Sequence, residues 1–263
     1  MKLLLLSIFF ILFFSVQAQY NFYRGNLHSH SAFSDGNKEN LLAYDTPAEN
    51  YDFAKTALQF DFLGISEHNH SLAGMNLSNY NLGRAQAATS TTPTFVAMYG
   101  MEWGTISGGG HVIIYGVDSL MGWEAGNYDI FTPYQDYDSL FAQVRSRPNA
   151  FSYLGHPSTN HFDSIFYKPL NTVKDDAIIG SAVRSGPAFS TDTTYTNPST
   201  GSYYARYKGL LGLGYHVGPT LDHDNHYTTF GKTTPARTVV LATSLTESNL
   251  VSAFQNRRFL CVR

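Results

Sequence analysis

Residues 21–36 read Asn-Phe-Tyr-Arg-Gly-Asn-Leu-His-Ser-His-Ser-Ala-Phe-Ser-Asp-Gly, and the interpretation of the whole chain starts from this stretch. Its first part predicts a strand over residues 21–31 that carries His28 and His30 near its end. Because residues two apart on a strand point to the same side, both imidazoles can reach one metal ion. The polar turn 34–36 follows and can bring the carboxylate of Asp35 back to the strand end. A single His-x-His pair is weak evidence, so further ligands must come from other segments.

A regular alternation of strand and helix candidates follows this first strand. Thr46, Pro47 and Glu49 are typical of a helix start, with a capping threonine and a proline in the first turn. Residues 60–66 form a short apolar run, as expected for a strand covered on both faces. The further strand candidates are 94–101, 111–117, 150–154, 177–183, 213–219 and 238–242, and the further helix candidates are 77–89, 137–145, 203–211 and 246–256. This alternation predicts parallel βαβ units, enough of them to close a barrel.

Composition excludes several classes of function. The chain has 263 residues with 43% hydrophobic and only 14% charged residues, and its formal net charge is −3. No basic surface for nucleic acid or anionic lipid is therefore expected. Cys261 is the single cysteine, which excludes an intramolecular disulfide and a thiolate zinc site. Ten histidines remain as the main candidates for metal ligands.

The first eighteen residues predict a signal peptide. Lys2 precedes an apolar run over residues 3–14, and Val16-Gln17-Ala18 is an acceptable cleavage signal. The run is shorter than the about 20 residues of a transmembrane helix, although an uncleaved anchor is the alternative. We expect a secreted or periplasmic protein whose mature part, residues 19–263, is one domain without other membrane segments. Residues 257–262 resemble the beginning of a further strand, which favours a truncated C-terminus over a frayed one.

Most of the remaining metal-competent side chains lie just past the end of a strand candidate. They are His68, Glu102, His156, Asp224 and His226, and His111 follows the flexible glycines 108–110. In a parallel barrel the C-terminal strand ends share one face, where active sites are built. Six separate segments converging in this way would be improbable by chance, and we therefore predict a metal centre at that face. Asp222 is an alternative to Asp224, although the Asp-x-His pattern favours Asp224.

These motifs, taken together and in order, resemble those of the PHP (polymerase and histidinol phosphatase) superfamily. Residues 25–30 with 34–36 resemble its first motif. Residues 65–69 resemble its second, although Glu67 stands where the family usually has aspartate. The later motifs are matched by residues 100–102 with 110–112, residues 155–157 and residues 224–226.

The resemblance implies an α/β fold, a distorted (β/α)7 TIM-like barrel with its metal site at the C-terminal strand ends. It implies two or three divalent ions, and ligands of this kind suit zinc, manganese or iron. One ion would be held by His28, His30, Glu102 and Asp224, a second by Glu102, His111 and His156, and a third by Asp35, His68 and His226. Glu102 would thus bridge two ions.

The function implied is that of an exported multinuclear metal-dependent phosphoesterase, in which metal-bound hydroxide attacks a phosphate ester. Three divalent ions would exceed the charge of their carboxylates and one hydroxide by about two units, which favours an anionic substrate. Glu102, His226 and Arg184 are expected to act in catalysis, and Arg184 follows strand 177–183 at the end suited to bind phosphate. An exposed arginine without such a role is equally compatible with this position.

Two other functions remain open. One is a metallohydrolase of carboxylic esters, amides or carbamates, and the other is a non-catalytic metal- or glycan-binding barrel. We expect no obligate protein partner in any of these cases. His70 is a candidate for substrate contact or proton donation, with a surface hydrogen bond as the more ordinary role, and His161 is expected on a loop surface.

Overall fold

The computed structural model describes residues 19–40, 42–57, 59–194 and 201–262, so the predicted signal peptide lies outside the described residues. Nine strands form one sheet, in the order β11-β10-β1-β2-β3-β4-β7-β8-β9. They are β1 (Asn21–Asn26), β2 (Phe62–His68), β3 (Val96–Trp103), β4 (Val112–Tyr115), β7 (Phe151–Leu154), β8 (Ile178–Arg184), β9 (Gly218–Leu221), β10 (Arg237–Ala242) and β11 (Phe259–Val262). The two outer strands meet, because Cys261 Sγ of β11 lies 3.0 Å from Pro219 O of β9. The sheet is therefore a nearly closed barrel, which confirms the predicted fold class.

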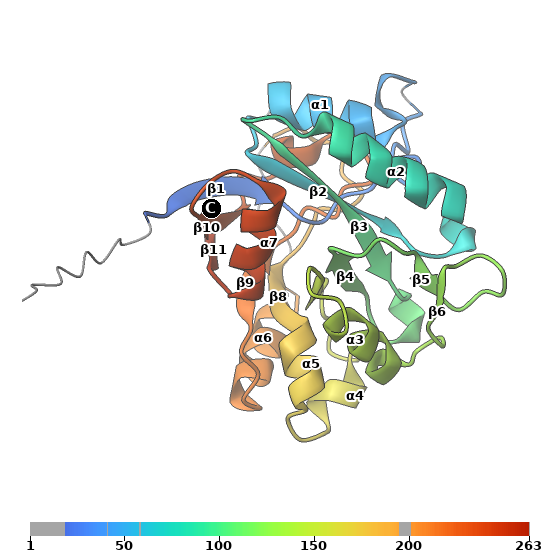
Figure 1. Ribbon diagram of the computed structural model, residues 1–263, viewed down its shortest axis with the longest axis vertical. Helices are drawn as coiled ribbons and strands as arrows, with labels where there is room; N and C mark the ends of the chain where they lie inside the picture. The colour runs from blue at the N-terminus through green and yellow to red at the C-terminus, as the bar shows by residue number, and fades with distance from the viewer. Residues whose placement is uncertain (1–18, 41, 58, 195–200, 263) are drawn as a thin grey trace, which may run out of the picture.

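Helices cover the barrel in two groups (Figure 1). The first pair, α1 (Pro47–Ala57) and α2 (Leu77–Ser90), lies side by side along β2 and β3. The second group packs along β7 and β8 and comprises α3 (Tyr137–Arg145), α5 (Thr172–Ala177) and α6 (Tyr203–Gly212), with the short α4 (Asp163–Phe166) nearby. Smaller elements complete the chain: the strand pair β5 (Met121–Gly122) and β6 (Ile130–Phe131), and the 3-10 turns η1 (Leu42–Tyr44), η2 (Ser71–Ala73), η3 (Ile106–Gly108) and η4 (Phe230–Lys232). No helix in the described ranges has the length and apolar character needed to span a bilayer.

Strand direction departs from the all-parallel prediction. β1, β2 and β3 are parallel, as are β7, β8 and β9, but β4 runs antiparallel to both β3 and β7. β10 is antiparallel to both β1 and β11. The reason at β4 is the connection from β3, which spans only residues 104–111 and is too short for the helical crossover of a dozen residues that parallel strands need.

The barrel interior is lined by every second residue of each strand. Val96 and Met98 of β3 belong to an inner core cluster, whereas Ala97 and Tyr99 pack in the separate cluster beneath the helices. Continuing this alternation puts Glu102, at the C-terminal end of β3, on the inner side of the barrel. The strand period therefore aims the carboxylate of Glu102 over the barrel axis.

Tyr115 fills the space directly below the strand ends. Its hydroxyl donates to Leu27 O (2.7 Å), and its ring lies against the backbone of Gly64 and Gly100. A Cβ atom on Gly64 would lie 2.3 Å from Tyr115 Oη, closer than any tolerated contact. Gly64 and Gly100 thus leave room for the Tyr115 ring, which forms the floor below the strand ends.

The opposite end of the barrel is closed by α7 (Glu247–Gln255). Leu250 and Phe254 of this helix are fully buried in the inner core cluster, where Phe254 contacts the rings of Phe62 and Phe151. The side chain of Gln255 donates to Ala150 O (3.1 Å), just before β7 begins. With α7 closing one end, side chains at the other end are the ones free to receive a ligand.

Gly64→Ala is expected to destabilise the protein by about 1–3 kcal/mol, because the added methyl group overpacks the floor against Tyr115. Gly212→Ala is the matched control, since a Cβ there meets no atom within 4 Å and alanine is the better helix former. Urea unfolding followed by circular dichroism measures both. Equal stability of the two variants would contradict the packing described for the floor.

Candidate metal centre

The nine side chains predicted as metal ligands gather at one rim of the barrel. They form three groups in which the ligand atoms lie within 4.8 Å of one another. The groups are His28, Glu102, His156 and Asp224; His30, Asp35, His68 and His226; and His68, Glu102 and His111. Residues separated by almost two hundred positions therefore surround one small volume.

Glu102 occupies the centre of this cluster. Its carboxylate is fully buried, and each oxygen faces a different set of imidazoles. The distances from Oε1 are 2.7 Å to His111 Nδ1, 2.9 Å to His156 Nε2 and 3.0 Å to His28 Nε2, and those from Oε2 are 3.0 Å to His68 Nδ1 and 3.3 Å to His30 Nε2. This is the position of a carboxylate that can bridge two ions.

The grouping differs from the one that the family resemblance implies. His30 falls with Asp35 rather than with His28, and His156 falls with His28. His28 and His30 nevertheless point to the same side, because Ser29 between them pairs with Asn225 in an isolated parallel bridge and His28 Nε2 lies 3.2 Å from Asp224 Oδ1. His30 still lies between groups, since its Nε2 is 3.2 Å from Asp224 Oδ1.

Several of these buried ligand atoms form no hydrogen bond within the described part of the chain. They are His28 Nε2, His68 Nδ1, Asp35 Oδ1 and Glu102 Oε2. His28 Nε2, for example, lies 3.0 Å from Glu102 Oε1 but not in hydrogen-bonding geometry. Buried polar atoms normally have partners. Convergent nitrogen and oxygen atoms without partners fit divalent cations, and the mixture of imidazole and carboxylate suits zinc, manganese or iron.

Backbone hydrogen bonds hold the ligand-bearing segments together. The N–H of Asp224 donates to His28 O (2.8 Å), and that of His30 donates to Asn225 O (3.2 Å). The side chain of Asn26 joins the same two segments, because its Oδ1 accepts from His223 N (3.1 Å) and its Nδ2 donates to His28 O (2.8 Å). The first and last motifs are thus fixed side by side independently of any ion.

Two ligands sit on strained backbone. Asp224 has φ of 52° and His156 has φ of 22°, in the left-handed region that non-glycine residues rarely adopt. Such conformations cost of order 1–3 kcal/mol and concentrate at functional sites. Here they turn one carboxylate and one imidazole toward Glu102.

Asp222 supports the cluster in a role that the sequence interpretation missed. The sequence offers Asp222 only as a substitute for Asp224, but in the structure the two carboxylates lie on different sides of the His28 ring. Asp222 Oδ2 lies 3.4 Å from His28 Nδ1, on the side of the ring away from Glu102, and Tyr153 donates to Asp222 Oδ1 (3.1 Å). A carboxylate behind a ligand histidine fixes its tautomer and orientation. The two aspartates two positions apart, Asp222 and Asp224, are the feature of the sequence that could have indicated this role.

Glu67, the departure from the family motif, is also buried behind a ligand. It accepts hydrogen bonds from the N–H of Ser31 (3.2 Å) and from the hydroxyls of Ser31 and Ser34, and it lies 4.0 Å from His30 Nδ1. Burial raises the pKa of Glu67 to about 7, although His30 and the serine hydrogen bonds oppose this shift. Glu67 therefore braces the segment that carries His30.

Electrostatics of the cluster couple the carboxylates to the imidazoles. Burial alone would raise the pKa of Glu102, but the charges of His111 and His28 hold it well below its usual range. Burial alone would lower the pKa of His30, but Asp224 and Glu102 raise it to about 10. The same carboxylates raise the pKa of His28 against the effect of burial. Protons therefore compete with cations for these nitrogens.

Three further residues singled out in the sequence lie around the cluster. Arg184 ends β8 at the same rim, where its O accepts from Asp222 N (3.1 Å), but its guanidinium makes no contact with the described ligand atoms. His70 lies between His68 and Trp123, with ring centroids 5.4 and 6.1 Å away. His161, expected on the surface, is buried instead, because its loop folds onto Gly110 and the Ser158 N–H donates to its Nδ1 (3.2 Å).

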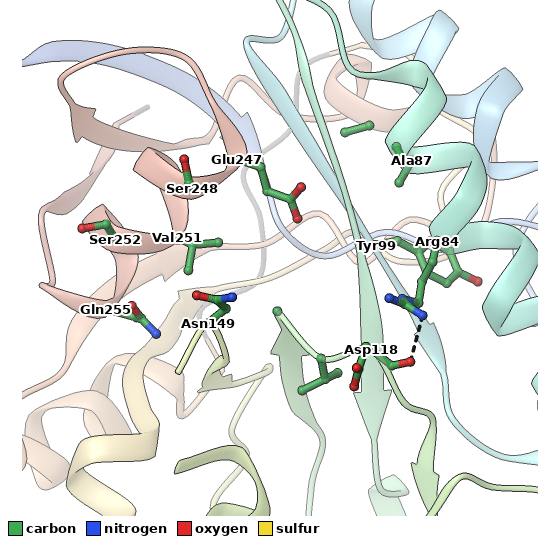
Figure 2. Close-up of a pocket in the computed structure, with 14 residues that line it drawn as sticks. Arg84, Ala87, Tyr99, Asp118, Asn149, Glu247, Ser248, Val251, Ser252 and Gln255 are labelled. Atoms are coloured by element: carbon green, nitrogen blue, oxygen red, sulfur yellow. Dashed lines mark hydrogen bonds between the residues drawn. The ribbon is translucent and has the colours of Figure 1, made fainter. Parts of the chain in front are cut away.

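Figure 2 shows a separate cavity of about 530 Å³ near the closed end of the barrel. Arg84 of α2 and Glu247 of α7 reach into it from opposite sides, and Arg84 donates to Asp118 O (2.8 Å). None of the nine metal-ligand candidates lines this cavity. The metal-ligand candidates are therefore confined to the rim that carries Glu102.

Comparison with known proteins supports the fold. A two-domain protein from Bacteroides vulgatus that contains a predicted PHP-like metal-dependent phosphoesterase superposes with a TM-score of 0.58 at 19% identity, over 92% of this chain. This chain spans 65% of that protein's length. At this identity the comparison shows a shared fold, as the motif resemblance implies.

Two other structures are more distant. A protein from Bifidobacterium adolescentis, described as a metal-dependent phosphoesterase, gives a TM-score of 0.48 at 12% identity over 89% of this chain and 96% of its own. PsfC from Pseudomonas syringae gives 0.47 at 15% identity over 92% of this chain and 91% of its own. No protein-family model and no curated protein sequence matches this chain.

Glu102→Ala is expected to remove more than one equivalent of metal, because its two oxygens face different ligand groups. Elemental analysis after reconstitution with zinc or manganese measures the ratio of metal to protein. Asp224→Asn, which alters one group, should lose less, and Glu247→Ala at the opposite end should lose none. Unchanged metal content in folded Glu102→Ala would refute the bridging position.

Metal binding is expected to release protons, because His28 and His30 have raised pKa values in the metal-free cluster. Below a pKa of about 10, His30 is mostly protonated, so affinity should fall at each step from about pH 9 to pH 6. Calorimetric titration with zinc in buffers of different ionisation enthalpy measures the released protons. Binding heats that are the same in all buffers would contradict the protonated state of these imidazoles.

Proposed function

We propose that this protein is an exported, multinuclear metal-dependent phosphoesterase. The observation that carries the proposal is the convergence of six imidazoles and three carboxylates on one rim, with buried Glu102 at their centre. A cluster of this size exceeds what a single structural ion needs, since such an ion takes four ligands. The PHP-like fold of the Bacteroides protein is consistent with this function, and the motif resemblance points the same way.

The first ion would be held by His28, Glu102, His156 and Asp224, and a second by His30, Asp35, His68 and His226. His111, whose Nδ1 lies beside Glu102 Oε1, would be available with Glu102 to hold a third ion. Bound divalent ions supply Lewis acidity toward phosphoryl oxygens and make water nucleophilic near neutral pH. The side chains of the protein would hold these ions and orient the substrate beside them.

Hydrogen bonds in the chain prepare the imidazoles for this role. The Nδ1–H of His226 donates to Asp224 O (2.9 Å), so the neutral ring leaves Nε2 unprotonated toward Asp35 Oδ1, 3.4 Å away. Asp222 does the same for His28 from behind the ring. Once the competing protons are displaced, these hydrogen bonds leave the Nε2 lone pairs directed at the cluster, above the buried Tyr115 ring.

Phosphate esters are the substrates that fit the charge of the site. Three divalent ions would bring six positive charges, whereas Asp35, Glu102 and Asp224 with Asp222 and Glu67 behind them bring at most five negative charges, so the loaded cluster would stay positive. We further propose that Arg184, at the end of β8, binds a phosphoryl oxygen as a charged hydrogen-bond donor. Glu102 and His226 would act through the ions that they hold.

Export is the part of the proposal that rests on the sequence alone. The apolar run 3–14 and the Val16-Gln17-Ala18 cleavage signal place the mature terminus near Gln19. In the described structure, Gln19 and Tyr20 precede β1 and are exposed, so cleavage there leaves the barrel intact.

The test is hydrolysis of p-nitrophenyl phosphate compared with p-nitrophenyl acetate by the protein loaded with zinc, manganese or iron. We expect metal-dependent turnover of the phosphate, inhibition by inorganic phosphate, and loss of at least about a hundredfold in kcat/KM for Asp224→Asn. Arg184→Gln should lower kcat/KM about tenfold or more without changing metal content. Preference for the acetate would support the carboxylic-ester alternative, and full metal loading without turnover of either would support a binding function.

A further inference from the structure

Phe189 presents an exposed aromatic ring at the edge of the metal-ligand cluster. It lies in the loop after β8, and 63% of its surface is exposed. Its ring centroid is 4.4 Å from that of the ligand candidate His226, with the planes inclined by 32°. The His226 N–H donates to Ala188 O (2.9 Å), which fixes the two segments beside each other. One face of the phenyl ring is therefore against the cluster, and most of the rest is open.

Lys38 provides a positive charge at the same place. Its Nζ lies 3.2 Å from Asp35 Oδ2 and 5.5 Å from the centroid of the Phe189 ring. The other oxygen of Asp35 faces the imidazoles of His68 and His226, at 3.6 and 3.4 Å. The Lys38 N–H donates to His226 O (3.0 Å), so this ammonium is anchored next to the cluster at its backbone as well.

Together, Lys38 and Phe189 can bind a kind of ligand that neither side chain would bind alone. A lysine ammonium has three donors, and Asp35 takes only one of them at the observed distance. An open phenyl face binds planar groups by stacking. A ligand that joins an anion to an aromatic ring within a few bonds would contact the cluster, Lys38 and Phe189 together.

We propose that Lys38 and Phe189 form a substrate subsite that selects phosphate esters of aromatic alcohols over those of small aliphatic alcohols. The phosphoryl group would lie at the metal cluster within reach of Lys38, and the aromatic group would stack on Phe189. This inference rests on the proposed phosphoesterase function, which assigns the phosphoryl group to the cluster. Lys38 and Phe189 are specificity residues here, since neither is among the metal-ligand candidates.

The experiment measures binding rather than turnover, by calorimetric titration of the metal-loaded protein with benzylphosphonate and methylphosphonate. Neither compound has an ester bond to hydrolyse. We expect the benzyl compound to bind about tenfold more tightly, as one stacking contact provides. Phe189→Leu should abolish this preference while leaving methylphosphonate affinity unchanged. Lys38→Gln should weaken both compounds to a similar extent, with metal content measured alongside to show that Asp35 still holds its ion.

Phe22→Leu is the matched control, because Phe22 is 64% exposed at the start of β1, away from the cluster. It should keep the wild-type preference. Equal binding of the two phosphonates to the wild type, or an unchanged preference in Phe189→Leu, would overturn the subsite while leaving the phosphoesterase proposal intact. Binding of neither phosphonate, together with no hydrolysis of p-nitrophenyl phosphate, would overturn both.

Discussion

The buried carboxylate of Glu102 is the constraint around which the rim of this barrel is organised. Removing a carboxylate from water costs several kcal/mol unless positive charge surrounds it, and five imidazole nitrogens lie within 3.3 Å of its two oxygens. Those imidazoles are buried too, so protons or metal ions must supply the charge that balances the carboxylates. A rim of this kind is stable only with cations in it, which couples the stability of the strand ends to the occupancy of the site.

The residue types and spacing were sufficient to predict which side chains gather at the rim, but not how they group there. Each predicted ligand lies at the expected rim, because strand ends in an α/β barrel meet there. His111 reaches it for a different reason: it precedes β4, and the antiparallel direction of that strand brings its start to the ends of its neighbours. Strand direction depends on connection length and pairing, which a pattern of apolar residues does not encode. The grouping of the imidazoles was also unpredictable, because it depends on where the loops after the strands place Asp35 and His156.

Residues behind the ligands were harder to recognise than the ligands themselves. The Asp-x-Asp spacing singles out Asp222, but nothing in the sequence identifies what Asp222 or Glu67 contacts, because their partners His28 and Ser31 become neighbours only through the fold. Glu67 shows how a change from the family motif can be accommodated: the extra methylene of glutamate lets the carboxylate reach two serine hydroxyls and the Ser31 N–H. The serines of the first motif are therefore part of the site, although they bind no metal themselves.

In the proposed function, metal binding and substrate choice would be linked through shared segments. The turn that supplies Asp35 also supplies Lys38, and the backbone of His226 is bonded to both Lys38 and Ala188. Filling the cluster with ions would order Asp35 and His226, and with them the ammonium and the phenyl ring that stand beside them. Substitutions in the loop around Phe189 can change the substrate while the ligands stay in place, which is how one barrel can serve many reactions.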